Sequence, residues 1–191
     1  MSSTRQEVIT WARQVVAESE ALILDTETTG LEAHDEVIQL AIVDLQGNVL
    51  LQTLVRPTVP VGTEARAIHG ITDAVLAEAP SFAQLHETIA ELLGNRSVLA
   101  YHADFDRRLL AQTCAKYGLP PLAGAAWDCV MERYAHFWGA RAAPGQHKPQ
   151  SLSHACAQQG IHVHGQHEAV ADCLLTLAVI KAMAVAEEDV E

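Results

Sequence analysis

Hydrophobic positions recur along this chain with two different periods, and the changes between them predict its secondary structure. Near the start, apolar residues at helical spacing predict a first helix. They are Val8, Trp11, Ala12, Val15 and Val16. Thr4 and Glu7 have the spacing of a capping box, which favours a helix start at Thr4. Three β-type runs follow and predict the strands of a meander, at residues 21–27, 35–44 and 48–57.

The rest of the chain alternates between helical and strand-like segments. Apolar spacing and the stop signals of Gly and Pro predict helices over residues 81–93, 104–117, 152–159 and 168–185. Short apolar runs predict two more strands, over residues 97–101 and 127–130. The segment 139–150, with its Pro and Gly residues, is predicted as a loop. Strands followed by strand–helix alternation indicate an α/β fold, with a mixed sheet flanked by helices.

The composition indicates one compact domain. Of the 191 residues, 49% are hydrophobic and 19% charged, which is enough apolar material for a core. We expect an N-terminal helix over residues 1–20, packed on or beside a domain over residues 21–186, and an acidic tail over residues 187–191. The most apolar stretch, residues 173–186, is too short to cross a membrane. Because the first residues also lack the pattern of a secretory signal, a cytoplasmic location is expected.

Charge and cysteine spacing narrow the function classes. The formal net charge is −12, which argues against a protein that holds nucleic acid by bulk positive charge. It remains compatible with an enzyme whose divalent cations bridge carboxylates to phosphate. The cysteines are too widely spaced for a CxxC metal or redox pair and are expected as buried thiols: Cys114, Cys129, Cys156 and Cys173.

Two carboxylates lie at the end of the first predicted strand. Asp25 and Glu27 are two residues apart, and the two-residue period of a strand points both side chains to one face. Two like charges side by side favour a bound cation. The alternative is that both are simply exposed where residues 28–30 begin a turn.

The last predicted helix carries a third acid, Asp172. This helix is apolar nearly all round, and Lys181 lies about half a turn away, so Asp172 is expected to face the interior. A buried carboxylate needs a partner, a hydrogen bond or a metal ion. The alternative to a metal ion is a partner elsewhere in the fold.

A fourth acid, Asp106, lies in the first turn of the helix over residues 104–117. The helix dipole favours acids there, so a capping role for Asp104 or Asp106 is the alternative to a functional one. Strand ends and the helix starts that follow them are where α/β sheets gather their sites, which allows Asp106 to converge with Asp25 and Glu27.

His167 precedes Asp172 by five residues, a spacing that cannot put both side chains on one helix face. We therefore expect His167 in the loop or first turn, where an imidazole can act as a general base near neutral pH. The alternative is a zinc site that joins His162, His164 and His167, with or without Cys156. Their HxHxxH spacing is not one of the common structural zinc patterns.

Three ordered motifs together resemble a known family. They are DTETTG at residues 25–30, YHADFDRRLL at residues 101–110 and HEAVAD at residues 167–172, and AIHGIT at residues 67–72 is a further similar segment. The sequence resembles the DEDD exonucleases of the histidine variety (DEDDh), and among them the proofreading subunits of bacterial replicative DNA polymerases. The resemblance covers residues 21–183.

This resemblance implies a ribonuclease H-like fold with a mixed five-stranded sheet. It implies 3′→5′ hydrolysis of single-stranded DNA, with release of nucleoside 5′-monophosphates and two divalent cations, Mg²⁺ or Mn²⁺. The metal ligands would be Asp25, Glu27, Asp106 and Asp172, which suits Mg²⁺ because it prefers oxygen ligands. His167 would deprotonate the attacking water. The pocket for the terminal nucleotide would be formed by Thr28, Thr29, Gly30, Leu31, His69 and His102.

Two features depart from the family pattern. Many members carry asparagine where this chain has His102, which puts the substrate preference in question rather than the activity. Polymerase-bound relatives usually carry a C-terminal extension, and the residues after Val185 are too few to supply one. A stand-alone exonuclease is therefore expected, and association with a polymerase is left open.

Two other functions stay open. A ribonuclease of the same fold, trimming RNA or short oligonucleotides, would differ in contacts to the 2′-hydroxyl, which the sequence does not place. A non-catalytic module that binds nucleic acid or a protein would be favoured by loss of a carboxylate or of the histidine, and all five are present.

Basic residues before and within the segment 139–150 form a further candidate feature. They either guide a nucleic-acid strand toward the site or belong to an ordinary soluble loop. They are Arg133, Arg141 and Lys148, with His136 and His147.

Overall fold

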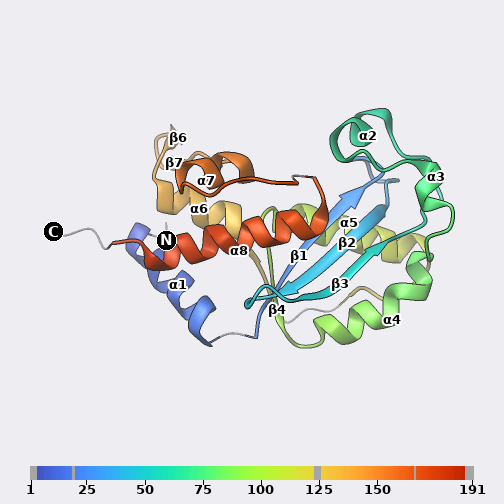
Figure 1. The fold of residues 1–191 in the computed structure, drawn as a ribbon, viewed down its shortest axis with the longest axis horizontal. Coiled ribbons are helices and arrows are strands. Elements are labelled where there is room, and N and C mark those ends of the chain that lie inside the picture. Colours follow the sequence, from blue (N-terminus) through green and yellow to red (C-terminus); the bar gives the residue numbers. More distant parts are fainter. Residues whose placement is uncertain (1–3, 19, 123–125, 166, 188–191) are drawn as a thin grey trace.

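A mixed sheet of five strands forms the centre of the protein (Figure 1). The computed structural model describes residues 4–18, 20–122, 126–165 and 167–187. The strands are β1 Leu22–Thr28, β2 Val37–Asp44, β3 Val49–Leu54, β4 Ser97–Ala100 and β5 Ala126–Cys129. They lie in the order β3-β2-β1-β4-β5, with β2 antiparallel to β1 and β3, and with β1, β4 and β5 parallel. The predicted meander and mixed sheet are confirmed.

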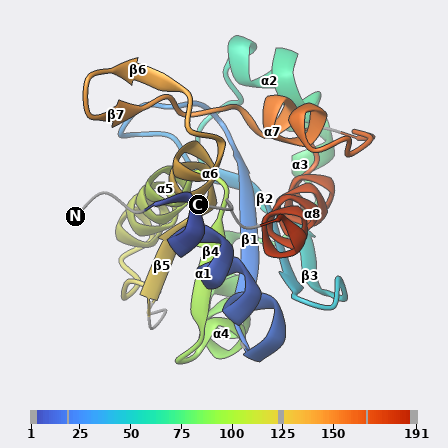
Figure 2. The same cartoon turned by 90° about the vertical axis from the view of Figure 1, so that its left-hand side faces the viewer.

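Helices cover both faces of the sheet (Figure 2). They are α1 Arg5–Glu18, α2 Thr63–His69, α3 Asp73–Leu76, α4 Phe82–Leu93, α5 Ala103–Lys116, α6 Val130–Trp138, α7 Leu152–Gln158 and α8 Ala169–Val185. The core on one face is built from β1, β2, α4 and α5. The core on the other face contains α8, which lies across the sheet, and α1, α6 and α7.

The alternation of side chains along β1 decides which groups meet on each face. Leu24 points into the core with α4 and α5, whereas Ile23 points into the core with α1 and α8. By the same alternation, Asp25 and Glu27 lie on the α8 side and Thr26 lies on the α5 side. The strand therefore presents acids to one helix layer and a hydroxyl to the other.

The predicted first helix is present as α1, and its capping box is formed. The Glu7 N–H donates to Thr4 Oγ1 (3.2 Å), and the Thr4 N–H donates to the Glu7 carboxylate (2.6 Å). The Arg13 side chain donates to the carbonyl oxygen of Ala184 (3.0 Å), at the end of α8. The buried stripe of α1 lies in the same core as α8 and consists of Val8, Ile9, Ala12 and Val15. Most of the expected acidic tail, residues 188–191, lies outside the described residues.

Three parts of the chain differ from the sequence prediction. The helices α2 and α3 lie where none was predicted, and α6 follows β5 directly. The predicted loop contains a small hairpin of β6 (Arg141–Ala143) and β7 (Gln146–His147). No residue of α2 is buried, and β6 is exposed throughout. Short elements on the surface carry no apolar period, which is why the pattern missed α2 and the hairpin.

The cysteines and the apolar helices agree with the expectations from composition. Cys114, Cys156 and Cys173 are buried free thiols, and Cys129 is half-buried. Cys173 Sγ lies 3.7 Å from the carbonyl oxygen of Ile23 in β1 and 3.7 Å from that of Ala41 in the neighbouring strand β2, between the sheet and α8. Among the described residues, no helix is long and apolar enough to cross a membrane.

Thr113→Val is expected to destabilise the protein by about 1–3 kcal/mol, because it leaves the buried N–H of Val37 without a hydrogen-bond acceptor. The buried Thr113 hydroxyl accepts the Val37 N–H of β2 (3.2 Å) and donates to the Leu109 carbonyl of α5 (2.7 Å). Urea unfolding measures the effect. Thr88→Val on the exposed face of α4 is the matched control. Equal unfolding free energies for the two variants would contradict this account.

Candidate active site

The carboxyl end of β1 carries two acids on the face that α8 covers. Asp25 and Glu27 are half-buried, and their spacing of two residues puts them on the same face. Pairing with β2 fixes their position, with Asp25 opposite Ala41 and Glu27 opposite Gln39. Both carboxylates therefore lie in one place next to the start of α8.

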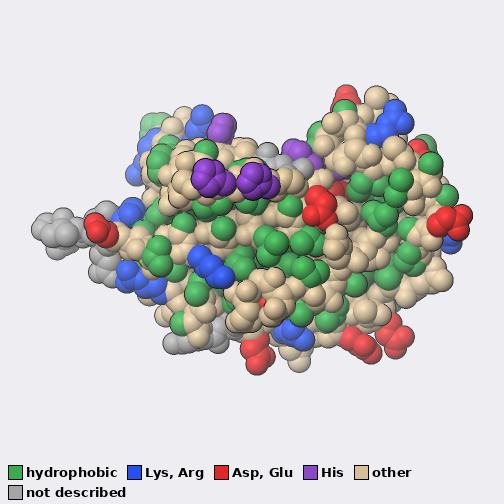
Figure 3. Space-filling view, in the orientation of Figure 1, with side chains coloured by type: hydrophobic (Ala, Val, Ile, Leu, Met, Phe, Trp, Pro, Cys, Tyr) green, Lys and Arg blue, Asp and Glu red, His purple; other side chains and the backbone are tan. Residues whose placement is uncertain are grey.

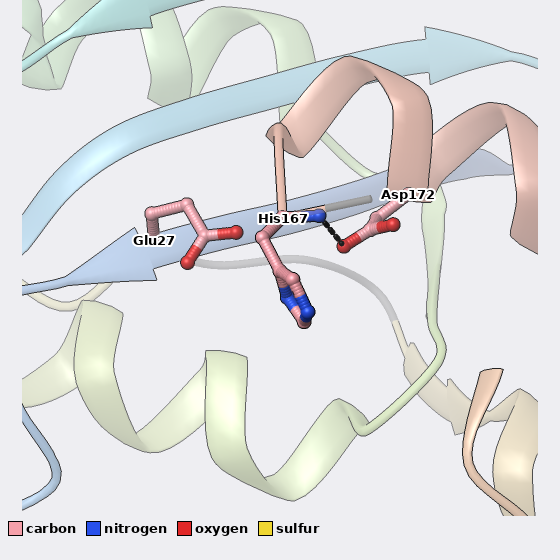
Figure 4. A group of neighbouring side chains, drawn as sticks. All are labelled: Glu27, His167 and Asp172. Atoms are coloured by element: carbon pink, nitrogen blue, oxygen red, sulfur yellow. Dashed lines mark hydrogen bonds between the residues drawn. The ribbon is translucent and has the colours of Figure 1, made fainter. Parts of the chain in front are cut away.

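The start of α8 brings a histidine and a third acid over this face (Figure 4). His167 lies before the helix with a left-handed backbone (φ 63°), and its N–H donates to Asp172 Oδ2 (3.2 Å). Such a backbone is uncommon for a residue with a side chain, and here the Asp172 carboxylate holds it. Ligand atoms of Glu27, His167 and Asp172 lie within 4.8 Å of one another. The expected loop position of His167 is confirmed.

Two glutamines from neighbouring strands fix this segment to the sheet. Gln39 Oε1 on β2 accepts the Ala169 N–H (3.1 Å). Gln52 Nε2 on β3 donates to the Glu168 carboxylate (2.8 Å), whose other oxygen caps the Ala171 N–H (3.2 Å). The segment that carries the histidine and the acid is therefore held by two strands at once.

Asp106 approaches from the opposite helix layer. It lies in the first turn of α5 and is 3% exposed, and its Oδ1 accepts a hydrogen bond from the Thr26 hydroxyl of β1 (2.8 Å). The N-cap residue of α5 is His102, and the exposed Asp104 pairs with Arg107 (3.1 Å). The capping alternative is therefore wrong for Asp106, because its carboxylate bonds to the central strand instead.

Burial raises the pKa values of all four acids, and neighbouring carboxylates raise those of Asp25 and Glu27 further. Desolvation, followed by the carboxylates of Asp106 and Asp172, raises the pKa of Asp25 well above its usual range. Burial, and then repulsion from Asp172, raises the pKa of Glu27 to about 7. Burial also raises the pKa of Asp106 to about 7 and that of Asp172 above its usual value. Three segments far apart in the sequence thus place four carboxylates in one electrostatic cluster.

The donor set of this cluster fits a hard divalent cation. Carboxylate oxygens are the ligands that Mg²⁺ and Mn²⁺ prefer, and a cation would offset the repulsion between the acids. Asp172 Oδ1 is buried and has no hydrogen-bond partner among the described residues, so it is available as a ligand. The alternative zinc cluster is not formed in the described part of the chain, where His162 and His164 do not join His167 in one group of ligands.

A cavity of about 720 Å³ opens beside Glu27. It lies between the turn after β1, the segment that leads into α2, and Phe105 of α5. His102 does not line the cavity but stacks on Phe105, with 5.9 Å between the ring centroids. Five of the residues that the resemblance assigns to a nucleotide pocket line it: Thr28, Thr29, Gly30, Leu31 and His69.

The turn after β1 is built around the buried carboxylate of Asp35. The Thr29 hydroxyl donates to Asp35 Oδ1 (2.6 Å), and the Thr28 hydroxyl donates to the Gly30 carbonyl (2.8 Å). A Cβ at Gly30 would lie 2.5 Å from Asp35 Oδ2, so this position requires glycine. Since both hydroxyls are used within the turn, Leu31, which is 69% exposed, is the apolar side chain that the turn offers to a ligand.

His69 ties α2 to the end of β1. The Ile71 N–H donates to His69 Nδ1 (3.0 Å), so Nε2 carries the proton and donates to the Thr28 carbonyl (3.2 Å). Burial lowers the pKa of His69, which favours this neutral form. The Gly62 N–H also donates to the Thr29 carbonyl (2.8 Å). The outer wall of the cavity is therefore bonded to the backbone of the strand that carries the acids.

Several residues of the site had no signal in the sequence analysis. Arg108 of α5 donates to the Leu31 carbonyl (3.3 Å), and its guanidinium lies over the Phe105 ring (5.4 Å). Thr26 and the two glutamines act through long-range hydrogen bonds that no local pattern reveals. Glu168 is the N-cap of α8, and the sequence offers no clear signal for it, because N-caps favour the shorter Asp, Asn, Ser and Thr.

Arg133 is not one of the basic residues beside the site. Its guanidinium forms two hydrogen bonds with the Asp128 carboxylate (2.8 and 3.0 Å) and lies over the Trp11 ring (5.0 Å). It therefore connects β5, α6 and α1. Of the two alternatives left open for the basic residues, this pairing makes a role in guiding a strand less favourable for Arg133, and charge spacing alone does not show which charges are already paired.

Comparison with known proteins agrees with this geometry. The family RNase_T, described as "Exonuclease", matches residues 22–180. The chain belongs to the DEDDh exonuclease family. This membership makes the protein a hydrolase of phosphodiester bonds in nucleic acid, and it implies a divalent metal. The expected ribonuclease H-like fold is confirmed as well.

Individual relatives of this exonuclease support the assignment. The phage 186 protein named uncharacterized exonuclease CP81 is 38% identical over 176 residues, which are 87% of this chain and 89% of that protein. Exodeoxyribonuclease 10 of Escherichia coli K12 is 31% identical over 168 residues, 83% of this chain and 66% of that enzyme. The structure of Exonuclease X in complex with 5′ overhanging duplex DNA is similar, with a TM-score of 0.64 and 29% identity, over 85% of this chain and 90% of that chain.

The raised pKa values predict a loss of stability with rising pH in the metal-free exonuclease. Unfolded Asp and Glu titrate near pH 4, whereas folded Glu27 and Asp106 titrate at about 7. Between these values the folded state holds protons that the unfolded state has released, so the stabilisation is lost as pH rises through about 7. Thermal unfolding in EDTA between pH 5 and pH 8 measures this. Adding Mn²⁺ at pH 8 is expected to raise the melting temperature.

Asp25→Asn removes one of the repelling charges and provides the test. At pH 8 in EDTA, this variant is expected to have a higher melting temperature than the wild type. Mn²⁺ is expected to raise its melting temperature less than that of the wild type. Asp104→Asn is the control, since Asp104 is exposed and pairs with Arg107. If Asp25→Asn gained as much from Mn²⁺ as the wild type, Asp25 would not be a ligand.

Proposed function

We propose that this exonuclease removes nucleotides from the 3′ end of single-stranded DNA and releases nucleoside 5′-monophosphates. The observation that carries the proposal is the cluster of four carboxylates and an exposed histidine beside a cavity of about 720 Å³. This volume is typical of sites for small molecules and cofactors. DNA is favoured over RNA by the name of the E. coli relative, an exodeoxyribonuclease, and by the DNA in the Exonuclease X structure.

Asp25, Glu27, Asp106 and Asp172 are the proposed holders of two divalent cations, Mg²⁺ or Mn²⁺. When bound, such ions stabilise the attacking and the leaving oxygen of a phosphodiester hydrolysis. Support comes from the unpartnered Oδ1 of Asp172 and from the mutual repulsion of the acids. Thr26 keeps the Asp106 carboxylate in position through its hydroxyl.

His167 is the proposed general base that takes a proton from the attacking water. Its ring is exposed and near Glu27 and Asp172, while its backbone N–H is bonded to Asp172. His69 is unsuited to this role, because both of its ring nitrogens are bonded within the protein. Histidine is the side chain that most often transfers protons in enzymes.

The cavity is the proposed pocket for the 3′-terminal nucleotide. Leu31 and Phe105 offer apolar surface to a base, and residues 28–30 offer the backbone of the turn. His69 contributes by holding the outer wall. His102 reaches the pocket through its stacking on Phe105, so it is expected to affect substrate preference more than the hydrolytic step.

The proposed reaction predicts a descending ladder of products from a 5′-labelled strand. DNA and RNA strands of the same sequence, each with Mg²⁺, Mn²⁺ or EDTA, show which sugar is preferred. Asp25→Asn is expected to abolish the ladder, because it removes a ligand charge at nearly constant shape, and Asp104→Asn is expected to retain it. Faster degradation of RNA would make the enzyme an exoribonuclease. Binding without cleavage in both metals would support a non-catalytic module.

His167→Ala is expected to lower kcat by about 10²- to 10⁴-fold, the usual contribution of a general base. Stabilisation by Mn²⁺ should remain close to that of the wild type, because the proposed ligands are the four carboxylates. Single-turnover cleavage and melting in a Mn²⁺ series measure the two effects. His154→Ala, an exposed histidine on α7, is the matched control. A parallel loss of metal stabilisation would make His167 a ligand instead.

A further inference from the structure

The hairpin formed by β6 and β7 carries two basic side chains that have no acidic partner. Arg141 and Lys148 are exposed, and neither forms an ion pair with the residues that the structure describes. Figures 1 and 2 show the hairpin at the same edge of the molecule as α2, which forms the outer wall of the cavity. The surface between these two projections is hollowed, as Figure 3 shows.

Two histidine rings lie against each other beside these basic side chains, one in β7 and one in α6. The rings of His136 and His147 lie 4.3 Å apart, centroid to centroid. Desolvation, and then the neighbouring His136 and Arg141, lower the pKa of His147. His147 Nδ1 is buried and has no hydrogen-bond partner among the described residues. The positive charge of this hairpin therefore comes from Arg141 and Lys148, in a chain whose net charge is −12.

The base of the hairpin is bonded to Tyr101, just before the start of α5, the helix that carries Asp106. The Lys148 N–H donates to the Ala140 carbonyl (2.7 Å) and closes the hairpin. The Gln150 side chain donates to the Lys148 carbonyl (2.9 Å), and the Tyr101 hydroxyl donates to the Gln150 carbonyl (2.9 Å). Tyr101 follows β4 and directly precedes the N-cap of α5. The basic side chains are thus held relative to the acids rather than on an independent loop.

The tip of the hairpin leaves room for a large ligand. Residues 142–145 are Ala-Ala-Pro-Gly, and all four are exposed. Small side chains at the tip allow a polymer to approach the basic groups at its base. A nucleic-acid strand is the polyanion that matches this charge, and contacts to its phosphates fix its position without reading its sequence.

We propose that this basic hairpin, defined by Arg141 and Lys148, binds the sugar–phosphate backbone of the substrate strand on the 5′ side of the nucleotide being removed. The proposal rests on the proposed function, because the strand's 3′ end must lie in the cavity. The hairpin then holds the part of the strand that the cavity does not enclose. The contribution of the hairpin to binding therefore depends on the length of the strand that extends beyond the cavity.

The first test measures binding of a labelled oligothymidylate by fluorescence anisotropy over a series of salt concentrations, in an Asp25→Asn background that does not cleave it. Each phosphate contact on a single strand contributes about 0.7 to the slope of log Kd against log salt. Arg141→Ala/Lys148→Ala is therefore expected to lower this slope by about 1.4 and to weaken binding by about tenfold. Arg96→Ala/Lys181→Ala, which removes the same charge away from the hairpin, is expected to keep the wild-type slope.

The second test compares two substrates of the active enzyme. In Arg141→Ala/Lys148→Ala, kcat/KM for oligothymidylate is expected to fall much more than kcat/KM for the p-nitrophenyl ester of thymidine 5′-monophosphate. This ester has no upstream phosphate. The charge-preserving Arg141→Lys/Lys148→Arg is expected to restore the strand activity, which separates lost charge from lost folding.

The outcomes distinguish this proposal from the proposed function. If the wild type cleaves neither substrate, the proposed exonuclease activity is wrong. A second outcome is that the wild type cleaves both substrates. The hairpin proposal is then overturned if Arg141→Ala/Lys148→Ala and Arg96→Ala/Lys181→Ala show the same slope of log Kd against log salt and the same ratio of the two kcat/KM values. Loss of both substrates to the same extent in the hairpin variant would also overturn it, because the hairpin would then support the catalytic centre instead.

Discussion

Repulsion between buried carboxylates is the constraint on which the rest of this structure depends. Four acids meet near the carboxyl end of β1, where burial disfavours their charge and neighbouring carboxylates disfavour the charge of Asp25 and Glu27 further. The surrounding fold keeps them together: β2 and β3 hold the start of α8 through glutamine side chains, and Thr26 holds Asp106. A large apolar core on both faces of the sheet supplies the stability that such a cluster removes.

The sequence was most informative where one local period determined the position of a side chain. The two-residue period of β1 put Asp25 and Glu27 on one face, and the apolar surround of α8 marked Asp172 as an inward-facing acid. The five-residue spacing put His167 outside the helix. Each of these predictions needed only the geometry of a single strand or helix.

The missing parts of the prediction depend on contacts between distant segments. The bonds from Gln39 to Ala169 and from Gln52 to Glu168 join residues 130 and 116 positions apart. The paired state of Arg133 depends on α1 and β5, and α2 is a surface helix without a buried residue. The family resemblance pointed to His69, but its two hydrogen bonds, which make it a clamp, could only be seen in the folded chain.

The clamp at His69 has a consequence for repeated turnover. An enzyme that shortens a strand stepwise empties and refills the same pocket many times. Here the outer wall is bonded to the carbonyls of Thr28 and Thr29, so its shape is set by the backbone of the central sheet. The cost of ordering that wall is met once, when the chain folds, and each new end of the strand meets a pocket that is already formed.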